Sequence, residues 1–249
     1  MTGPLAYLLL FAAGLVAGTL NVIAGGGSFL TLPLLIFLGL PPTVANGTNR
    51  VGIFLQNVGA VWGFSRHGVV DWRAVLWAAA PATVGAGVGT WAALHVGEDT
   101  FRDVLAYLMI GVTLYTLWDP LGKVRRGAGE RAPNLPALVL GFFVVGVYGG
   151  FVQAGVGFLI LAATTLAGLD LVRGNAVKVL SVLIYTGLSL AMFAAEGKVV
   201  WGYGLALAAG TVLGSQLGVH LTVLKGHAWV RGVVTVAVIG LAVKLLLMG

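Results

Sequence analysis

Long apolar stretches alternate with short polar ones along almost the whole chain. A helix needs about 20 apolar residues, at about 1.5 Å of rise per residue, to cross the hydrocarbon core of a bilayer. Eight stretches approach or exceed this length, at 4–24, 43–65, 72–95, 101–118, 135–153, 171–194, 199–223 and 228–248. The pattern predicts an all-α integral membrane protein with roughly eight full crossings.

Two further apolar stretches, 28–38 and 157–167, are too short to cross a bilayer comfortably. Each follows a glycine-rich break and ends at a Gly-Leu pair before a turn signal. We therefore expect each to form a short half-helix that begins inside the membrane. The sequence leaves open whether each long and short pair makes two crossings or one re-entrant hairpin, and both choices give the same topology elsewhere.

The two halves of the chain match each other at a constant offset of 129 residues. The most informative matches involve the rarer residue types: Asn46 with Asn175, Phe64 with Phe193, Trp72 with Trp201 and Arg102 with Arg231. The pattern predicts a first membrane repeat at 1–118, a basic linker at 119–134 and a second membrane repeat at 135–249. Each repeat holds four long spans and one half-helix, and this odd number of segments predicts that the repeats are inverted.

The positions of the charged residues predict how the helices are oriented in the membrane. Only 9% of the residues are charged, against about 25% in a typical soluble domain. The basic linker is predicted to be cytoplasmic and the acidic loop at 96–100 to lie outside, so both termini fall outside. The net charge of +6 lies mostly in loops, and nothing in the pattern predicts a nucleic-acid partner. The absence of cysteine excludes disulfides and thiolate chemistry.

The repeated glycine breaks predict where a ligand could bind. Inverted repeats with broken helices are typical of transporters that bind their substrate near the bilayer midplane. A helix that begins inside the membrane presents unpaired N–H groups and a positive dipole end, which suit an anion. Alternatively, the glycines only allow close helix packing. The substrate-binding residues predicted at the breaks are Gly25, Gly26, Gly27, Ser28, Gln153, Gly155 and Gly157.

Two cations lie at membrane depth without a carboxylate at the same level. Arg50 and Lys178 stand on equivalent helices, whereas all eight acidic residues fall in loops or at helix ends. A charge at mid-bilayer costs at least about 2.5–3.5 kcal/mol, so the missing counter-ion is predicted to be the substrate. Two cations and two helix ends would suit a dianion. Alternatively, either cation reaches the interface or bonds to carbonyls freed at the helix breaks.

Polar neighbours accompany both cations at helical spacing. Asn46 and Asn49 can share a face with Arg50, and Asn175 can share one with Lys178, so all three join the predicted substrate site. Gln56 and Asn57 are equally compatible with the site and with interhelical packing. The sequence contains no catalytic constellation, phosphate-binding loop or metal motif, so we expect no enzyme activity, no cofactor and no metal.

The residues around both breaks resemble those of the sulfite exporter TauE/SafE family. In the first half they run from Gly25-Gly26-Gly27-Ser28-Phe29 through Pro33 to Ala45-Asn46-Gly47-Thr48-Asn49. In the second half they run from Gly149-Gly150 through Gly155-Val156-Gly157 to Gly174-Asn175-Ala176-Val177-Lys178. The resemblance covers nearly the whole chain. It implies a multi-pass permease of the plasma membrane for sulfite, organosulfonates or related sulfur-containing anions.

The sequence thus predicts a secondary transporter that works by alternating access, with export as the expected direction. An anion channel lined by the same cations and a non-transport membrane scaffold are the alternatives. The expected partners are a small anionic substrate and the lipid bilayer, with a homodimer left open.

Overall fold

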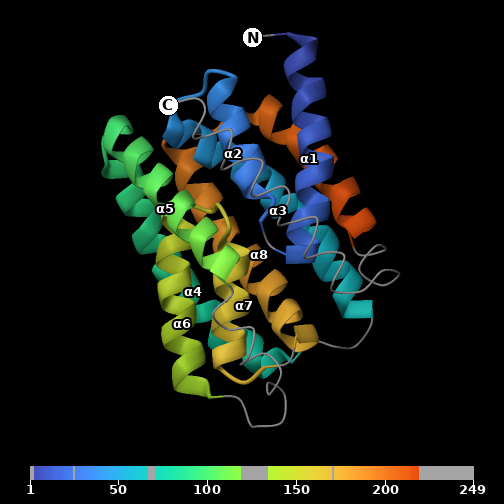
Figure 1. The fold of residues 1–249 in the computed structure, drawn as a ribbon, viewed down its shortest axis with the longest axis vertical. Helices are drawn as coiled ribbons and strands as arrows, with labels where there is room; N and C mark the ends of the chain where they lie inside the picture. Colours follow the sequence, from blue (N-terminus) through green and yellow to red (C-terminus); the bar gives the residue numbers. More distant parts are fainter. Residues whose placement is uncertain (1–2, 25, 67–70, 119–133, 170, 219–249) are drawn as a thin grey trace.

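A computed structural model describes residues 3–24, 26–66, 71–118, 134–169 and 171–218, and these ranges contain helices and no strands (Figure 1). The prediction of an all-α chain is therefore confirmed for this part of the chain. A further helix without a label occupies 201–218. The labelled helices are α1 (Pro4–Ala24), α2 (Ser28–Phe37), α3 (Pro42–Arg66), α4 (Trp72–His95), α5 (Glu98–Trp118), α6 (Leu135–Phe151), α7 (Val156–Leu166) and α8 (Leu171–Ala195).

Most helix bounds follow the apolar stretches closely, and the two clear differences have local causes. Helix α5 begins at Glu98, three residues before its apolar stretch, because carboxylates in the first turn suit the positive end of the helix dipole. Helix α6 ends at Phe151 instead of continuing to 153, because the backbone at Val152 is extended. The predicted span at 228–248 lies outside the described residues, as does most of the predicted linker.

Helices α2 and α7 are the predicted half-helices. They contain 10 and 11 residues, so each is about 15 Å long and could cross about half of a hydrocarbon core. Figure 1 shows α2 returning toward the end of the molecule at which α1 begins, and α7 returning toward the end at which α6 begins. Each pair therefore forms a hairpin whose break lies deep inside the molecule.

Equivalent helices of the two halves run in opposite directions. In Figure 1, α1 and α3 descend, whereas α6 and α8 rise. The helix bounds also agree with the offset of 129 residues, because Pro42–Arg66 shifted by this amount covers Leu171–Ala195.

Small residues let helices from different halves pack backbone to backbone. Helix α4 packs along α6, where a side chain at Gly89 or Gly150 would overlap a backbone carbonyl of the other helix. The equivalent pair, the 201–218 helix and α1, meets in the same way at Gly214 and Gly18. Such close contacts are a common way for helices to associate in lipid. In each half, the fourth helix along the chain, counting the half-helix, thus packs against the first helix of the other half.

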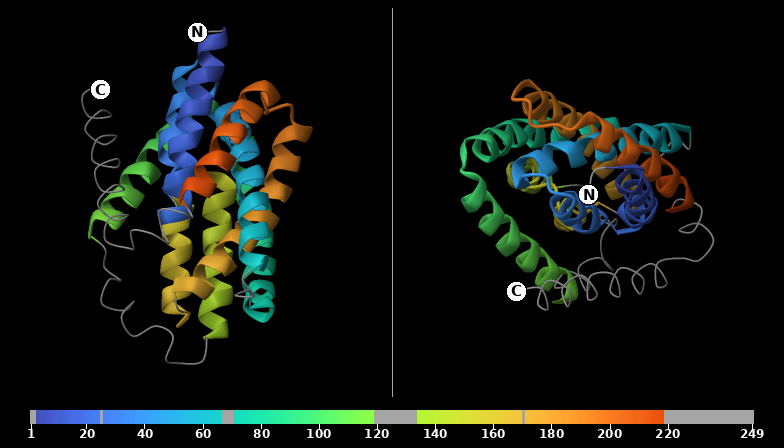
Figure 2. Two further views of the ribbon diagram at one scale, coloured as in Figure 1. Left: turned by 90° about the vertical axis from the view of Figure 1, so that its right-hand side faces the viewer. Right: turned by 90° about the horizontal axis from the view of Figure 1, so that it is seen from above.

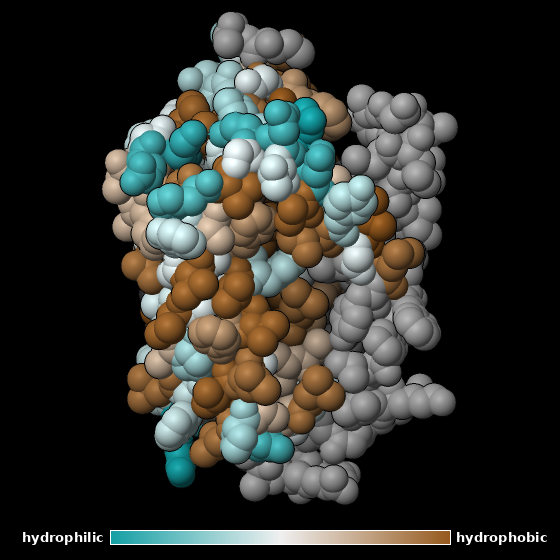
Figure 3. Space-filling view, turned by 90° about the vertical axis from the view of Figure 1, so that its left-hand side faces the viewer, coloured by the Kyte–Doolittle hydropathy of each residue, from teal (hydrophilic) through white to brown (hydrophobic). Residues whose placement is uncertain are grey.

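The outer surface carries many large apolar side chains. Figure 3 shows hydrophobic residues over most of the face formed by α4, α5 and α6, with hydrophilic residues gathered at its upper end. Figure 2 shows α5 at the edge of the bundle, tilted against the other helices. Within the described residues, two helices are long and apolar enough to cross a bilayer, at Pro4–Val22 and Arg173–Ala195. Exposed apolar side chains on α4, α5 and α6 include Leu76, Trp91, Tyr107, Ile110, Leu114 and Leu140.

Candidate functional site

The polar side chains of α3 and α8 form two layers in the interior. The two helices run antiparallel, so the first half of α3 lies level with the second half of α8. We call the level nearer the start of α1 the upper layer. It contains Asn46, Asn49 and Arg50 of α3, Thr186 and Ser189 of α8, and Gln153 from the segment between α6 and α7. The lower layer contains Gln56 and Asn57 of α3 with Asn175 and Lys178 of α8.

Arg50 is fully buried in the upper layer and bonded within the protein. One terminal nitrogen donates to the Gly150 carbonyl at 2.6 Å, and the other donates to Gln153 Oε1 at 3.2 Å. Its guanidinium carbon also lies 4.9 Å from the centre of the Phe193 ring. Gly150 belongs to the last turn of α6, whose unpaired carbonyls form the negative end of that helix. The described partners of Arg50 are therefore a helix end, an amide oxygen and an aromatic ring.

Other polar groups complete the upper layer around the same helix end. Asn46 Nδ2 donates to the Phe151 carbonyl at 2.8 Å, and Thr90 Oγ1 donates to the Gly150 carbonyl at 3.1 Å. Gln153 Nε2 donates to Thr186 Oγ1 at 2.6 Å, which holds the chain after the end of α6 against α8. The carbonyls that the end of α6 leaves unpaired are thus bonded by side chains of α3 and α4.

The beginnings of the two half-helices meet in the middle of the molecule. The rings of Phe29 and Phe158 stack with their centres 6.5 Å apart, and Gly26 lies against the Phe158 ring. The Gly27 N–H donates to Asn21 Oδ1 at 2.7 Å. Gly155 has a φ of 70°, a left-handed conformation that glycine adopts at little cost, and this turn allows α7 to begin directly after the break.

A cavity of about 50 Å³ opens beside these helix beginnings and reaches the lower layer. One buried water needs roughly 10–15 Å³ of such cavity volume, so the cavity could hold a few waters or one small ion. First-turn residues of both half-helices line it, together with valines and other apolar side chains. The polar side chains in its wall are Asn21, Ser28, Gln56, Asn57, Gln153, Asn175 and Lys178.

Lys178 is the charged residue among those that line the cavity. Its side chain is only 6% exposed, and within the described part of the chain it makes no hydrogen bond or ion pair. Ser28, 3% exposed, and Asn175 likewise make no side-chain hydrogen bond to a described residue. A buried ammonium without a partner is costly, and an anion in the cavity would remove that cost.

Comparison with known proteins identifies the family of a chain with this arrangement. A family model described as "Sulfite exporter TauE/SafE" matches residues 10–245, which is nearly the whole chain. The chain belongs to the TauE/SafE family. The resemblance inferred from the residues around the two breaks is therefore confirmed.

Individual relatives of this TauE/SafE protein carry transporter names. It is 32% identical to the probable membrane transporter protein YfcA of Escherichia coli (strain K12) over 249 residues, covering 99% of this chain and 91% of the relative. It is 30% identical to a probable membrane transporter protein of Haemophilus influenzae over 232 residues, covering 92% of this chain and 89% of the relative. No solved structure matches significantly. The family and these relatives indicate a membrane transporter.

In the structure of this TauE/SafE protein, the predicted site residues lie in three places. The first group lines the cavity: Ser28, Gln153, Gly157, Asn175 and Lys178. The second group forms the breaks beside it: Gly26, Gly27 and Gly155. The third group lies in the upper layer and is absent from the cavity wall: Asn46, Asn49 and Arg50. Gly25 lies outside the described residues.

Asn21 lines the cavity but was not among the predicted site residues. It bridges the two elements around the break, because Oδ1 accepts from the Gly27 N–H and Nδ2 donates to Gln56 Oε1 at 3.1 Å. A single amide in an otherwise apolar stretch of α1 was the available signal, since polar side chains inside membrane helices are costly and usually functional. Gln56 and Asn57, which the sequence leaves equally compatible with the site and with interhelical packing, both line the cavity.

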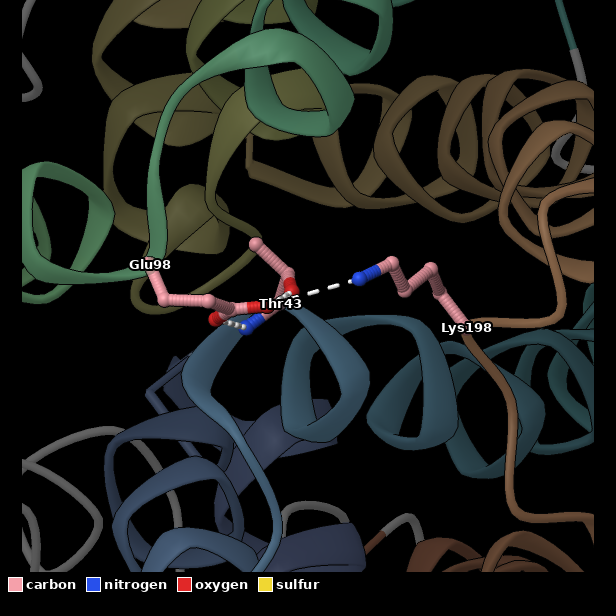
Figure 4. Close-up of polar contacts among 3 residues, drawn as sticks. All are labelled: Thr43, Glu98 and Lys198. Carbon is pink, nitrogen blue, oxygen red and sulfur yellow. Dashed lines mark hydrogen bonds and ion pairs between the residues drawn. The ribbon is translucent and has the colours of Figure 1, made fainter.

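A polar cluster joins three segments at the upper end of this TauE/SafE protein (Figure 4). Glu98, at the start of α5, accepts hydrogen bonds from the backbone N–H and the hydroxyl of Thr43 at the start of α3. Lys198, which follows α8, places Nζ 3.5 Å from Glu98 Oε1. Partial burial raises the pKa of Glu98, but the Thr43 bonds and the Lys198 ammonium outweigh it and hold the pKa below its ordinary value of 4.5.

This lowered pKa predicts a defined loss of stability in acid. A carboxylate whose pKa is lower in the folded state stabilises the protein above the unfolded pKa, and the contribution disappears as the pH falls through the folded pKa. We expect Glu98→Gln to lower the melting temperature at neutral pH and the difference from wild type to shrink below about pH 4.5. Melting curves across this range would check the expectation, with the exposed Glu196→Gln as the control. A pH-independent difference for Glu98→Gln would contradict it.

Proposed function

We propose that this TauE/SafE member is a secondary transporter for a small sulfur-containing anion, sulfite or an organosulfonate, and that it works as an exporter. The observation that carries the proposal is the Lys178 ammonium, which is buried and without a described partner in the wall of a cavity. Oxygen atoms of such an anion could accept hydrogen bonds from Lys178, Ser28 and Asn175. First-turn N–H groups of α2 and α7 would add favourable dipoles at the same place.

The proposed architecture consists of two inverted repeats, 1–118 and 135–249, joined by a cytoplasmic linker at 119–134 and making about eight crossings of the plasma membrane. Three observations support it: the common offset of the helix bounds, the opposite directions of equivalent helices and the two equivalent glycine contacts between the halves. Inverted repeats with a substrate site at broken helices favour a transporter that rocks one part of the fold against the other.

The two polar layers support alternating access in particular. In the upper layer most polar groups bond to other protein groups, and the buried atoms without a described partner there are Asn46 Oδ1, Asn49 Nδ2 and Arg50 Nε. The lower layer instead borders a cavity. The Thr43, Glu98 and Lys198 cluster also ties the upper ends of α3, α5 and the chain after α8 together. A site closed above and hollow below is the asymmetry that one state of an alternating-access transporter requires.

The distribution of charge suggests which side the hollow layer faces. In Figure 1, α4 and α8 begin at the lower end, where they carry Arg73 and Arg173 near their first residues. The upper end carries the acidic residues Glu98 and Asp99, which are paired there with Lys198 and Arg102. Because cytoplasmic ends of membrane helices are enriched in Lys and Arg, we assign the lower end to the cytoplasm. The cavity would then receive its anion from inside the cell, in keeping with export.

Flux measurements in proteoliposomes test this proposed function. With sulfite or methanesulfonate trapped inside, wild-type protein is expected to support saturable efflux at a low rate per molecule, because each cycle needs a conformational change. Empty liposomes and liposomes containing Lys178→Gln protein serve as controls. Channel-scale conductance in planar bilayers would show that the protein is an anion channel and not a transporter. The absence of any anion flux would reject both assignments.

A further inference from the structure

The charge of the preferred substrate can be inferred from the cavity, provided that the proposed anion site is correct. We propose that the cavity selects a monoanion, such as a sulfonate or the hydrogen sulfite form of sulfite, over a dianion such as sulfate or fully deprotonated sulfite. The proposal rests on Lys178 as the charged residue in direct reach of the cavity and on Arg50 being committed elsewhere.

Arg50 is the second cation that the sequence offered, and its contacts remove it from the cavity wall. Its terminal nitrogens face the Gly150 carbonyl and Gln153 Oε1, and its side chain has no exposed surface. Gln153 links the upper layer to the cavity, since it lines the cavity while its amide bonds to Arg50 and Thr186. An anion in the cavity therefore meets Gln153 before it could meet the guanidinium.

The helix ends near the cavity do not supply an equivalent second charge. Each half-helix begins where a longer helix ends, so the positive dipole end of α2 or α7 lies close to the negative end of α1 or α6. At α2, the N–H of the N-cap residue Gly27 is also taken, because it already donates to Asn21 Oδ1. The remaining polar wall groups, such as Ser28 and Asn175, are neutral and can orient an anion without compensating its charge.

Charge affects desolvation and attraction to Lys178 differently for the two anion classes. In a Born description, the cost of removing an ion from water grows with the square of its charge, whereas its attraction to one ammonium grows only in proportion to that charge. Going from a monoanion to a dianion thus doubles the gain at Lys178 and quadruples the desolvation cost. A site with one reachable cation favours the monoanion, unless a second cation is added.

Binding to purified protein tests this with tetrahedral anions of similar size. Isothermal titration is expected to give methanesulfonate a dissociation constant at least about tenfold lower than that of sulfate, a difference of about 1.4 kcal/mol. Introducing a cation into the lower layer with Asn57→Lys should bring sulfate binding to the level of methanesulfonate or beyond. The neutral replacement Asn57→Met serves as the matched control and should keep the wild-type preference.

The possible outcomes separate this inference from the proposed function. Sulfate binding as tight as or tighter than methanesulfonate binding, with both lost in Lys178→Gln, would overturn the monoanion preference and leave the anion site in place. A preference for methanesulfonate that Asn57→Lys leaves unchanged would show that the preference does not arise from the number of cations. Binding of neither anion would overturn the site itself and the monoanion inference with it.

Discussion

Lys178→Gln is expected to abolish measurable anion binding while the protein remains folded. The substitution removes the ammonium that faces the cavity and keeps a polar side chain of moderate length. Loss of one partner of a buried, hydrogen-bonded charge pair costs about 2–5 kcal/mol, so affinity should fall by at least about 30-fold. Isothermal titration with methanesulfonate on purified protein measures this directly.

The stability of the unliganded variant distinguishes a ligand-binding role from a structural one. Because Lys178 is buried and has no partner in the described part of the chain, Lys178→Gln should leave the melting temperature of the anion-free protein unchanged or raise it. The exposed cation Arg102, replaced in Arg102→Gln, provides the control for a general loss of positive charge. A destabilised Lys178→Gln protein with unchanged affinity would assign Lys178 a structural role instead.

Arg50→Met is expected to destabilise the protein strongly, with a secondary effect on binding. The substitution keeps a long side chain but leaves Gln153 Oε1 without its guanidinium donor and the Gly150 carbonyl with Thr90 as its remaining side-chain donor. The orphaned Gln153 oxygen costs about 1–3 kcal/mol and the bond lost at the Gly150 carbonyl about 1 kcal/mol, so we expect a loss of about 2–4 kcal/mol, and more if contact with the Phe193 ring adds to it. Thermal unfolding followed by size-exclusion chromatography in detergent measures the change.

The same replacement at Lys178 is the matched control for Arg50→Met. Both residues are buried cations on equivalent helices, but Arg50 has described partners and Lys178 has none. Lys178→Met should therefore lose anion binding without losing stability, and Arg50→Met should lose stability first. If both variants instead behaved alike, the assignment of one cation to the fold and the other to the ligand would be wrong.

Much of the fold could be predicted because the relevant signals are local. The length of an apolar stretch determines whether a helix can cross a bilayer, and glycine-rich breaks mark where α2 and α7 begin. The same signals placed Ser28, Gln153 and Gly157 at the cavity, because they lie at or beside these breaks. The number of crossings and the inverted repeats stay predictions.

The division of roles between Arg50 and Lys178 could not be predicted from the sequence alone. It depends on where α6 ends and toward which helix its last carbonyls point, and both are properties of the tertiary structure. Bonding to carbonyls freed at a helix break is one alternative that the sequence allows for each cation, and the structure shows this arrangement for Arg50. The two cations differ by one position in the alignment of the repeats, which corresponds to a rotation of about 100° around a helix. That rotation offers a physical reason why one cation faces the end of α6 and the other faces the cavity.

The most direct measurement of the central claim is the location of a heavy sulfite analogue in the protein. Crystals grown with selenite would reveal the bound anion through the anomalous signal of selenium. The cavity predicts one dominant peak within hydrogen-bond reach of Lys178 Nζ, beside Ser28 and Asn175, which disappears in Lys178→Gln crystals. A dominant peak at Arg50 in the upper layer, or a peak near Lys178 that persists in Lys178→Gln, would contradict the assignment of this cavity as the anion site.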